Sequence, residues 1–260
     1  MRKKEKMKKF IFTILSLLFI KNLYSQSIND INIEDYKLNS QITSFLVEEI
    51  KNNEEINIYQ ENNNIYVLGW SKDGKIAFIN NKYVDGRGGT NLYFVIQDLI
   101  EDKNVYYKKI KWYDNDNYGE NPEMAQTFEQ CILSNSKEFN NELSKNKIII
   151  KPVKVELLPA FDKNNNLIQF QISNINKYLG EYNFMHMDYE IRAVKNGKYK
   201  ILGKISNKVC DYVIPTGYIK SPYEDRIALI VANAEHVFEG DEVYINFYGC
   251  SLNAGYIMEK

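Results

Sequence analysis

Residues 68–81, LGWSKDGKIAFINN, decide how this chain folds. The segment places Asp73 and Gly74 between two apolar runs, and an Asp-Gly pair tolerates the backbone angles of a tight hairpin turn. Trp70 precedes the turn, and residues 76–79 form a run that is apolar on both faces. A strand with two apolar faces belongs in the middle of a stacked sheet. The segment therefore predicts a β-hairpin inside a strand-rich protein.

Runs of the same kind flank this hairpin and occur again near the end of the chain. Turn residues separate four of them, which predict an antiparallel meander: INIYQ (56–60), IYVLGWS (65–71), KIAFINN (75–81) and NLYFVIQDL (91–99), with VYYKKIKWY (105–113) as a candidate fifth strand. Four later runs predict a second meander: YKILGKIS (199–206), KVCDYVIP (208–215), RIALIVAN (226–233) and EVYINFYGC (242–250). We expect a mainly β fold with one or two helices and two antiparallel four-stranded meanders; an α+β fold and a β-sandwich are the alternatives.

Two segments show the spacing of an amphipathic helix. Residues 39–51 place apolar side chains on one face, which predicts a short helix. A longer helical insertion is expected near residues 121–145, where Asn121 can cap the first turn and Pro122 can occupy the first helical position. Residues 26–260 are accordingly expected to form a single globular β-rich domain. The apolar stripe of the longer helix is Met124, Ala125, Phe128, Cys131, Ile132, Phe139 and Leu143.

The hairpin segment has a weaker copy, SPYEDRIALIVAN (221–233), 151 residues further along the chain. LGWSKDGKIAF resembles one blade repeat of TolB-type, WD-like β-propellers, in which a strand similar to NLYFVIQDL follows. The resemblance implies propeller-like meanders, although complete propellers repeat about every 40–50 residues and need several blades. Paired units behind a signal peptide are also similar to bacterial predicted secreted proteins of unassigned function. The matched positions are Ser71, Gly74, Lys75, Ile76 and Ala77 with Ser221, Asp225, Arg226, Ile227 and Ala228.

The residues that carry the resemblance have a structural role in strand pairing. They imply no activity, because propeller blades serve binding proteins and enzymes alike. This structural motif consists of Trp70, Ser71, Asp73, Gly74, Ile76, Ala77, Asp225, Ile227 and Ala228.

The start of the chain has the pattern of a secretory signal peptide. Six basic residues and one acid stand in residues 1–9, and an apolar run occupies residues 10–20. This run is too short for a membrane span, which needs about 20 apolar residues. Ser25 supplies the small residue that a signal peptidase prefers. We therefore expect residues 1–25 to be removed and the protein to be periplasmic or secreted; an uncleaved anchor is the alternative.

The charge balance after cleavage argues against two classes of partner. Of the 33 basic and 34 acidic residues, seven and one lie in residues 1–25, so 26 basic and 33 acidic residues remain. Nucleic-acid binding needs a basic face to neutralise phosphates, and an anionic membrane surface makes the same demand. Neither partner is expected, and no membrane span remains after cleavage.

Cys131, Cys210 and Cys250 give an odd count without a C-x-x-C spacing. Such a count permits one internal disulfide at most. Cys210 and Cys250 fall in predicted strands and are the candidate pair. Three buried free thiols are the alternative.

Metal and anion sites receive little support from the sequence. Residues 114–125 begin like a calcium loop, but Tyr118 and Ala125 stand where oxygen ligands are needed. A solvated turn is therefore favoured. The DGRGG turn (85–89) could offer amides to an anion, but it lacks the lysine and helix start of a phosphate loop.

Catalytic signatures are also missing from the sequence. It contains two histidines, His186 and His236, and neither G-x-S-x-G nor H-E-x-x-H occurs. A carboxylate pair for glycoside hydrolysis cannot be chosen from so many acids. We therefore assign no catalytic residue, metal or cofactor.

These observations favour an exported, non-enzymatic protein that binds another component of the bacterial envelope, either a protein or a glycan. The abundant tyrosines suit such a role because they anchor interfaces. The alternative is a periplasmic or secreted hydrolase of glycans or peptides, with a site in residues 150–200. A small-ligand sensor is the third hypothesis. Two close carboxylates or a Ser-His contact in a pocket would favour the hydrolase.

The exported protein should begin near Gln26, because the apolar run is too short to anchor the chain. The intact mass of the exported form measures this. A membrane-bound species that keeps residues 1–25 would contradict the expectation.

Overall fold

Most of the described chain lies in three antiparallel β-sheets. The computed structural model describes residues 26–38, 63–84, 89–113, 126–180, 184–237 and 240–258. The prediction of a mainly β fold is confirmed, and the described residues contain one α-helix, α3 (Phe128–Lys145). No closed ring of blades is present among them, since the strands form three separate sheets.

The sheets are named here by their positions. The helix-covered sheet has the order β4-β3-β2-β1-β5, with β1 (Asn63–Trp70), β2 (Lys75–Val84), β3 (Gly89–Asp98), β4 (Lys103–Tyr113) and β5 (Ile149–Ile150). The central sheet has the order β13-β12-β11-β6, with β6 (Val155–Leu157), β11 (Tyr212–Lys220), β12 (Arg226–Val237) and β13 (Gly240–Ser251). The outer sheet has the order β14-β10-β9-β8-β7, with β7 (Ala160–Phe161), β8 (Leu167–Leu179), β9 (Met185–Lys195), β10 (Lys198–Val209) and β14 (Ile257–Met258).

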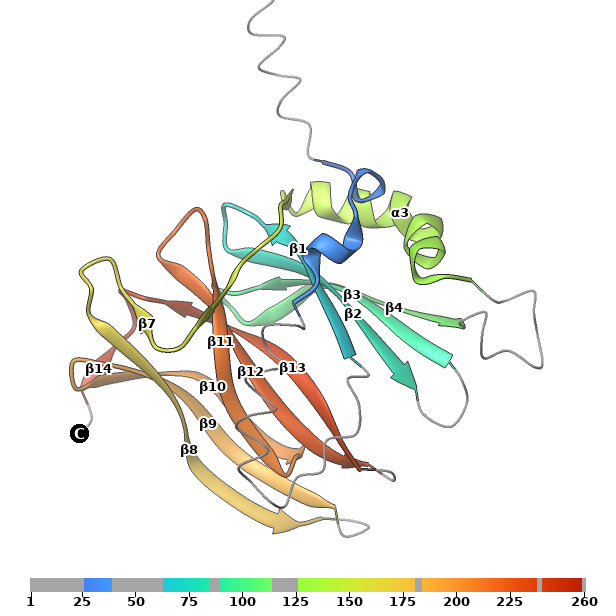
Figure 1. The fold of residues 1–260 in the computed structure, drawn as a ribbon. Coiled ribbons are helices and arrows are strands. Elements are labelled where there is room, and N and C mark those ends of the chain that lie inside the picture. Colours follow the sequence, from blue (N-terminus) through green and yellow to red (C-terminus); the bar gives the residue numbers. More distant parts are fainter. Residues whose placement is uncertain are drawn as a thin grey trace, which may run out of the picture.

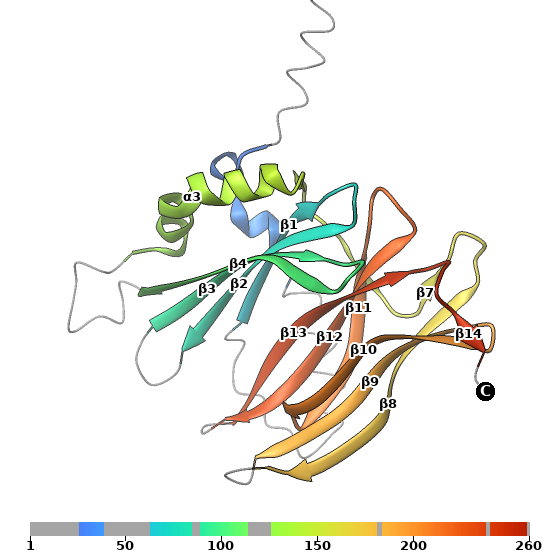
Figure 2. The ribbon, with the colours of Figure 1, turned by 180° about the vertical axis from the view of Figure 1, so that it is seen from behind.

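The elements stack as successive layers, with α3 first, then the helix-covered sheet, the central sheet and the outer sheet (Figures 1 and 2). Two short 3-10 helices, η1 (Ile28–Asp30) and η2 (Ile33–Tyr36), lie beside α3 and β1. The backbone N–H of Ile28 donates to Asn140 Oδ1 of α3 at 2.9 Å, which ties the start of the described chain to the helix.

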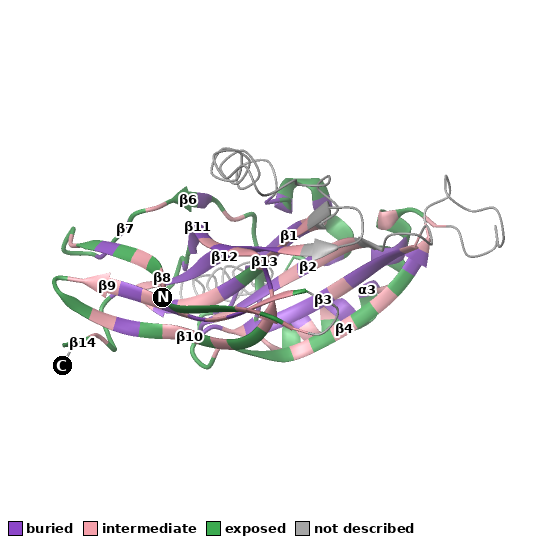
Figure 3. Ribbon diagram, turned by 90° about the horizontal axis from the view of Figure 1, so that it is seen from below, coloured by how far each residue is buried: buried purple, intermediate pink, exposed green. Residues whose placement is uncertain are grey.

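The central sheet is covered on both faces, and β12 shows why. Ala228, Ile230 and Ala232 pack toward the helix-covered sheet, while Leu229 and Val231 pack toward the outer sheet. All five side chains are buried. A strand buried on both faces reads as a continuous apolar run. Figure 3 shows the contrast with the outer sheet, where β9 alternates buried and partly buried residues and β10 is mostly exposed or partly buried.

Helix α3 covers the other face of the helix-covered sheet. Phe139 of α3 stacks on Phe94 of β3, with ring centroids 4.1 Å apart. Of the five described members of the expected apolar stripe, Cys131, Ile132, Phe139 and Leu143 are buried, and Phe128 is partly buried against the same cluster. The helix begins later than expected: its N-cap is Thr127, which forms a capping box with Gln130. This box satisfies the first backbone amides and so fixes the start of the helix.

The second meander is divided between two sheets, which differs from the predicted grouping. β10 pairs with β9 in the outer sheet, and β11 pairs with β12 in the central sheet. The switch occurs at two consecutive residues. The N–H of Cys210 donates to Met185 O at 3.0 Å, and the N–H of Asp211 donates to Ala234 O at 2.9 Å. The chain therefore changes sheets within one residue, a step that local apolar pattern does not reveal.

Cys131, Cys210 and Cys250 are all free and buried, so the candidate Cys210–Cys250 disulfide is not formed. Cys210 packs between the central and outer sheets among residues of β9 and β12, and Cys250 packs in a separate cluster with Ala160 and Ile168. Burial raises the pKa of the Cys210 thiol to about 11.

Several expectations concern residues outside the described ranges. They are the signal peptide at 1–25, the short helix at 39–51, the strand at 56–60, the turn residues 85–88 and the calcium-like loop at 114–125 with Asn121 and Pro122. No helix in the described part of the chain has the length and apolar character needed to cross a membrane.

Trp70→Ala and Ile227→Asp should both destabilise the protein, because Trp70 is 2% exposed and Ile227 is fully buried. Loss of a large buried aromatic costs about 3–5 kcal/mol, and an unpaired buried carboxylate costs a comparable amount. Thermal melts measure both effects. Ile257→Asp is the matched control, because Ile257 is 57% exposed. Unchanged melting of both core variants would contradict the layered packing.

Candidate functional site

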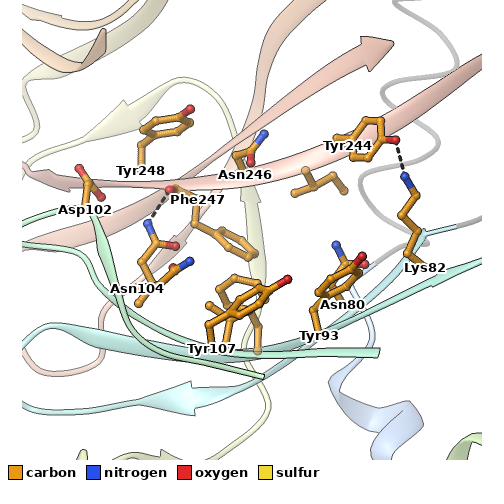
Figure 4. A pocket seen from close by; sticks show the side chains of 14 residues that line it. Asn80, Lys82, Tyr93, Asp102, Asn104, Tyr107, Tyr244, Asn246, Phe247 and Tyr248 are labelled. Atoms are coloured by element: carbon orange, nitrogen blue, oxygen red, sulfur yellow. Dashed lines mark hydrogen bonds between the residues drawn. The ribbon is translucent and has the colours of Figure 1, made fainter. Parts of the chain in front are cut away.

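A cleft of about 450 Å³ lies between the helix-covered sheet and the edge strand β13 (Figure 4). β13 is the edge strand of the central sheet, and its side chains line the cleft opposite those of the helix-covered sheet. Side chains of β2, β3 and β4 and of the turn before β4 line one side. The lining residues are Phe78, Asn80, Lys82, Tyr93, Val95, Gln97, Asp102, Asn104, Tyr107 and residues 244–248.

The inner end of the cleft is closed by contacts between the two sheets. The rings of Phe78 and Phe247 meet edge to face, with centroids 4.9 Å apart. Gln97 Nε2 donates to Phe247 O at 2.9 Å, and the N–H of Gly249 donates to Asp102 Oδ1 at 2.6 Å. Gly249 is required here, since a Cβ at this position would lie 1.7 Å from Leu99 O.

Two tyrosines from neighbouring strands form an aromatic platform on the helix-covered sheet. The ring centroids of Tyr93 and Tyr107 are 5.9 Å apart, with 37° between the ring planes. Tyr107 is 53% exposed. Figure 4 shows both rings beneath β13, beside Asn80. Tyr93 is partly buried, so the exposed ring of Tyr107 offers the larger surface for stacking against the apolar face of a ligand.

Buried acceptors without partners lie next to this platform. The Oδ1 atoms of Asn80 and Asn91 are buried and have no hydrogen-bond partner. Asn80 pairs with Tyr93 across β2 and β3, and Asn91 pairs with Lys82. Because side chains alternate along a strand, Asn91 lies on the same face as Tyr93. An unsatisfied buried acceptor costs about 1–3 kcal/mol, and of these two residues Asn80 lines the cleft.

An ion pair occupies the other end of the cleft. Lys82 Nζ lies 2.9 Å from Glu242 Oε2 and donates a hydrogen bond to the hydroxyl of Tyr244. Tyr244 in turn donates to Glu242 Oε2 at 2.6 Å. Burial alone would raise the pKa of Glu242, but the hydrogen bonds from Lys82 and Tyr244 lower it below its ordinary value. This end of the cleft is therefore neutralised internally.

Asp102 is the one carboxylate among the described lining residues. Burial raises the pKa of its carboxyl to about 6, although the Gly249 N–H and the Arg226 guanidinium favour the charged form. A raised pKa in a cleft is a recognised sign of a functional group, yet acid-base hydrolysis of a glycan needs a second carboxylate. The described residues also contain no cluster of three or more His, Cys, Asp or Glu side chains that could hold a metal.

The structural motif lies away from the cleft, in the two hairpin turns. Ser71 closes the first turn, donating to Lys75 O and accepting from Lys75 N, each at 2.9 Å. Asp73 forms an exposed ion pair with Lys75, and Trp70 ends β1 in the core. The carbonyl of Gly74 accepts from the N–H of Leu99 at 3.0 Å.

The second turn has a corresponding arrangement. The N–H of Ser221 donates to Arg226 O at 2.9 Å, and the carbonyl of Asp225 accepts from Leu252 N at 2.9 Å. Ile227 and Ala228 are buried on opposite faces of β12, as Ile76 and Ala77 are on opposite faces of β2. Each of the two segments thus contains the turn that leads into the second strand of an antiparallel pair, β2 after β1 and β12 after β11. The relationship to a propeller blade stays a prediction.

His186 lies on β9, far along the sequence from the cleft residues. Its ring stacks on Tyr178 at 5.7 Å, and its buried Nδ1 has no hydrogen-bond partner. Residue 236 falls in β12, outside the residues whose side chains are described.

None of the residues that line the cleft was predicted as a site residue from the sequence. A usable signal was present in NLYFVIQ (91–97), where Asn91, Tyr93 and Gln97 put polar and aromatic groups on a face that a fully covered strand would keep apolar. Gln97 contacts Phe247 of β13, which is 150 residues away in the sequence. Such a contact cannot be predicted from the sequence of either strand alone.

Comparison of the chain with models of protein families, with curated proteins and with solved structures gave no match.

Asp102 should make stability depend on pH between about 4 and 7. Its folded pKa of about 6 lies above the ordinary value of 3.8, so the folded state binds the proton more tightly and loses stability as pH rises through 6. Asp102→Asn should lack this loss and gain about 2 kcal/mol relative to wild type at pH 7.5, after allowance for partial exposure.

Thermal melts of both proteins from pH 4 to 7.5 measure the difference. Glu101→Gln is the matched control, because Glu101 is an exposed neighbour. A constant difference between Asp102→Asn and wild type across this range would show that the Asp102 carboxyl does not titrate there.

Proposed function

We propose that the chain is exported to the bacterial envelope, where it binds another envelope component and catalyses no turnover of its own. The inter-sheet cleft is the binding site. The observation that carries this proposal is the composition of the cleft: an aromatic platform and side-chain amides beside a single carboxylate. Binding sites of this type combine apolar contact area with a few polar groups that fix orientation.

The packing supports binding at the cleft. The lining strands are held by the closed contacts at Phe247 and Gly249, so the platform is attached to a rigid sheet. A preformed site loses little conformational freedom when it binds. Tyr107 needs no rearrangement to reach a partner, because half of its surface is already exposed.

The second candidate function is a hydrolase of glycans or peptides, favoured by one observation. The raised pKa of Asp102 would let its carboxyl act as a general acid near neutral pH. Against it, the described lining residues supply no second carboxylate and no histidine. The cleft is also formed by β2–β4 and β13 rather than by residues 150–200.

Crosslinking in intact cells tests the proposal. Wild-type protein should recover a specific envelope component, and Tyr107→Ala should reduce its recovery at least tenfold, because truncation of an aromatic anchor costs more than about 1.4 kcal/mol. Tyr223→Ala is the matched control: Tyr223 is 38% exposed and lies in the turn before β12, outside the cleft.

Purified protein should show no hydrolysis of glycan, peptide or ester panels. Reproducible turnover that disappears in Asp102→Asn would replace the binding proposal with the hydrolase. Equal recovery of the partner by wild type and Tyr107→Ala would remove the cleft as the binding site.

A further inference from the structure

We propose that the ligand of the cleft is a glycan chain, bound through an uncharged segment. The inference rests on the proposed binding function and adds the chemical class of the ligand. Three features of the lining lead to it: its charge, the combination of aromatic rings with side-chain amides, and the hydrogen bonds that already occupy backbone groups at the edge of β13.

Among the described residues that line the cleft, the one cation is already paired with a carboxylate. The ammonium of Lys82 is paired with Glu242, and the Asp102 carboxyl accepts from the backbone of Gly249. Lys109 stands beside the platform, with its ammonium 5.6 Å from the centroid of the Tyr93 ring, and does not line the cleft. An anionic ligand would therefore lose hydration without gaining a free counter-charge from the described lining residues.

The platform and the amides match the two surfaces of a sugar ring. One face of many pyranoses presents C–H groups, which favour the electron-rich faces of rings such as Tyr93 and Tyr107. The ring edge presents hydroxyl groups, each able to donate and accept. Asn80 offers a buried Oδ1 without a partner, and the exposed amide of Asn104 can both donate and accept. Both residues line the cleft, so their side-chain amides lie beside a ligand stacked on the platform.

The β13 edge argues against an extended peptide as the occupant. A peptide that adds to a sheet must pair with the free backbone groups of the edge strand. At the inner end of the cleft these groups are taken: Phe247 O accepts from Gln97, and Gly249 N–H donates to Asp102. Side chains of the helix-covered sheet thus stand where the backbone of an added strand would lie.

Titration of the exported protein with oligosaccharides tests the inference. The neutral probes are the tetrasaccharides of cellulose, chitin, mannan and β-1,3-glucan, and the anionic probe is tetragalacturonate. Binding is measured by tyrosine fluorescence and calorimetry. At least one neutral probe should bind, with Kd below about 1 mM, a weak affinity suited to a shallow site. Tyr93→Ala, Tyr107→Ala and Asn80→Ala should each weaken that binding tenfold or more, and Tyr223→Ala should leave it unchanged.

The variants must first show wild-type circular dichroism and cooperative melting; for one that does not, Tyr93→Leu or Asn80→Leu replaces it, because leucine keeps the volume and removes the ring or the amide. Neutral-probe binding that is unaffected by the cleft variants would overturn the inference, as would binding of tetragalacturonate alone. If no probe binds, while cells yield a protein partner whose capture is lost in Tyr107→Ala, the glycan inference fails and the binding function stands. If no probe binds and capture does not depend on Tyr107, both fail.

Discussion

Burial of the central sheet on both faces is the constraint on which the other layers depend. β12 carries one apolar set toward the helix-covered sheet and another toward the outer sheet, and neither set can face water without a large loss of hydrophobic stabilisation. Two further sheets are therefore needed. The helix-covered sheet is itself apolar on both faces around Ile76 and Ala77, and α3 with η1 and η2 completes its coverage.

The local part of this architecture could be predicted from the sequence. The Asp73–Gly74 turn, the doubly apolar runs and the stripe of α3 all appear in the structure because each depends on residues that are close together in the chain. The assignment of β10 and β11 to different sheets could not be predicted in this way. It is decided at Cys210 and Asp211, whose amides find carbonyls of β9 and β12, and nothing in their own side chains specifies those partners.

The candidate site was hidden for a related reason. The cleft is lined by two different sheets, so it depends on their relative placement rather than on any one segment. Tyr107 does not belong to any of the hydrophobic core clusters of the described residues. Because the hydrophobic clusters do not include Tyr93 or Tyr107, these positions can change with little effect on folding, and the scaffold can present other lining chemistry on the same strands.

The side chains that cap β13 have a consequence for the behaviour of the protein in concentrated solution. An exposed edge strand is a template on which a second molecule can extend the sheet, and long runs of such pairing lead to fibrils and precipitates. Gln97 and Asp102 interrupt the twelve-residue edge of β13 at Phe247 and Gly249. By occupying those groups, two polar side chains from another sheet limit self-assembly without a proline, a bulge or a covering helix at that edge.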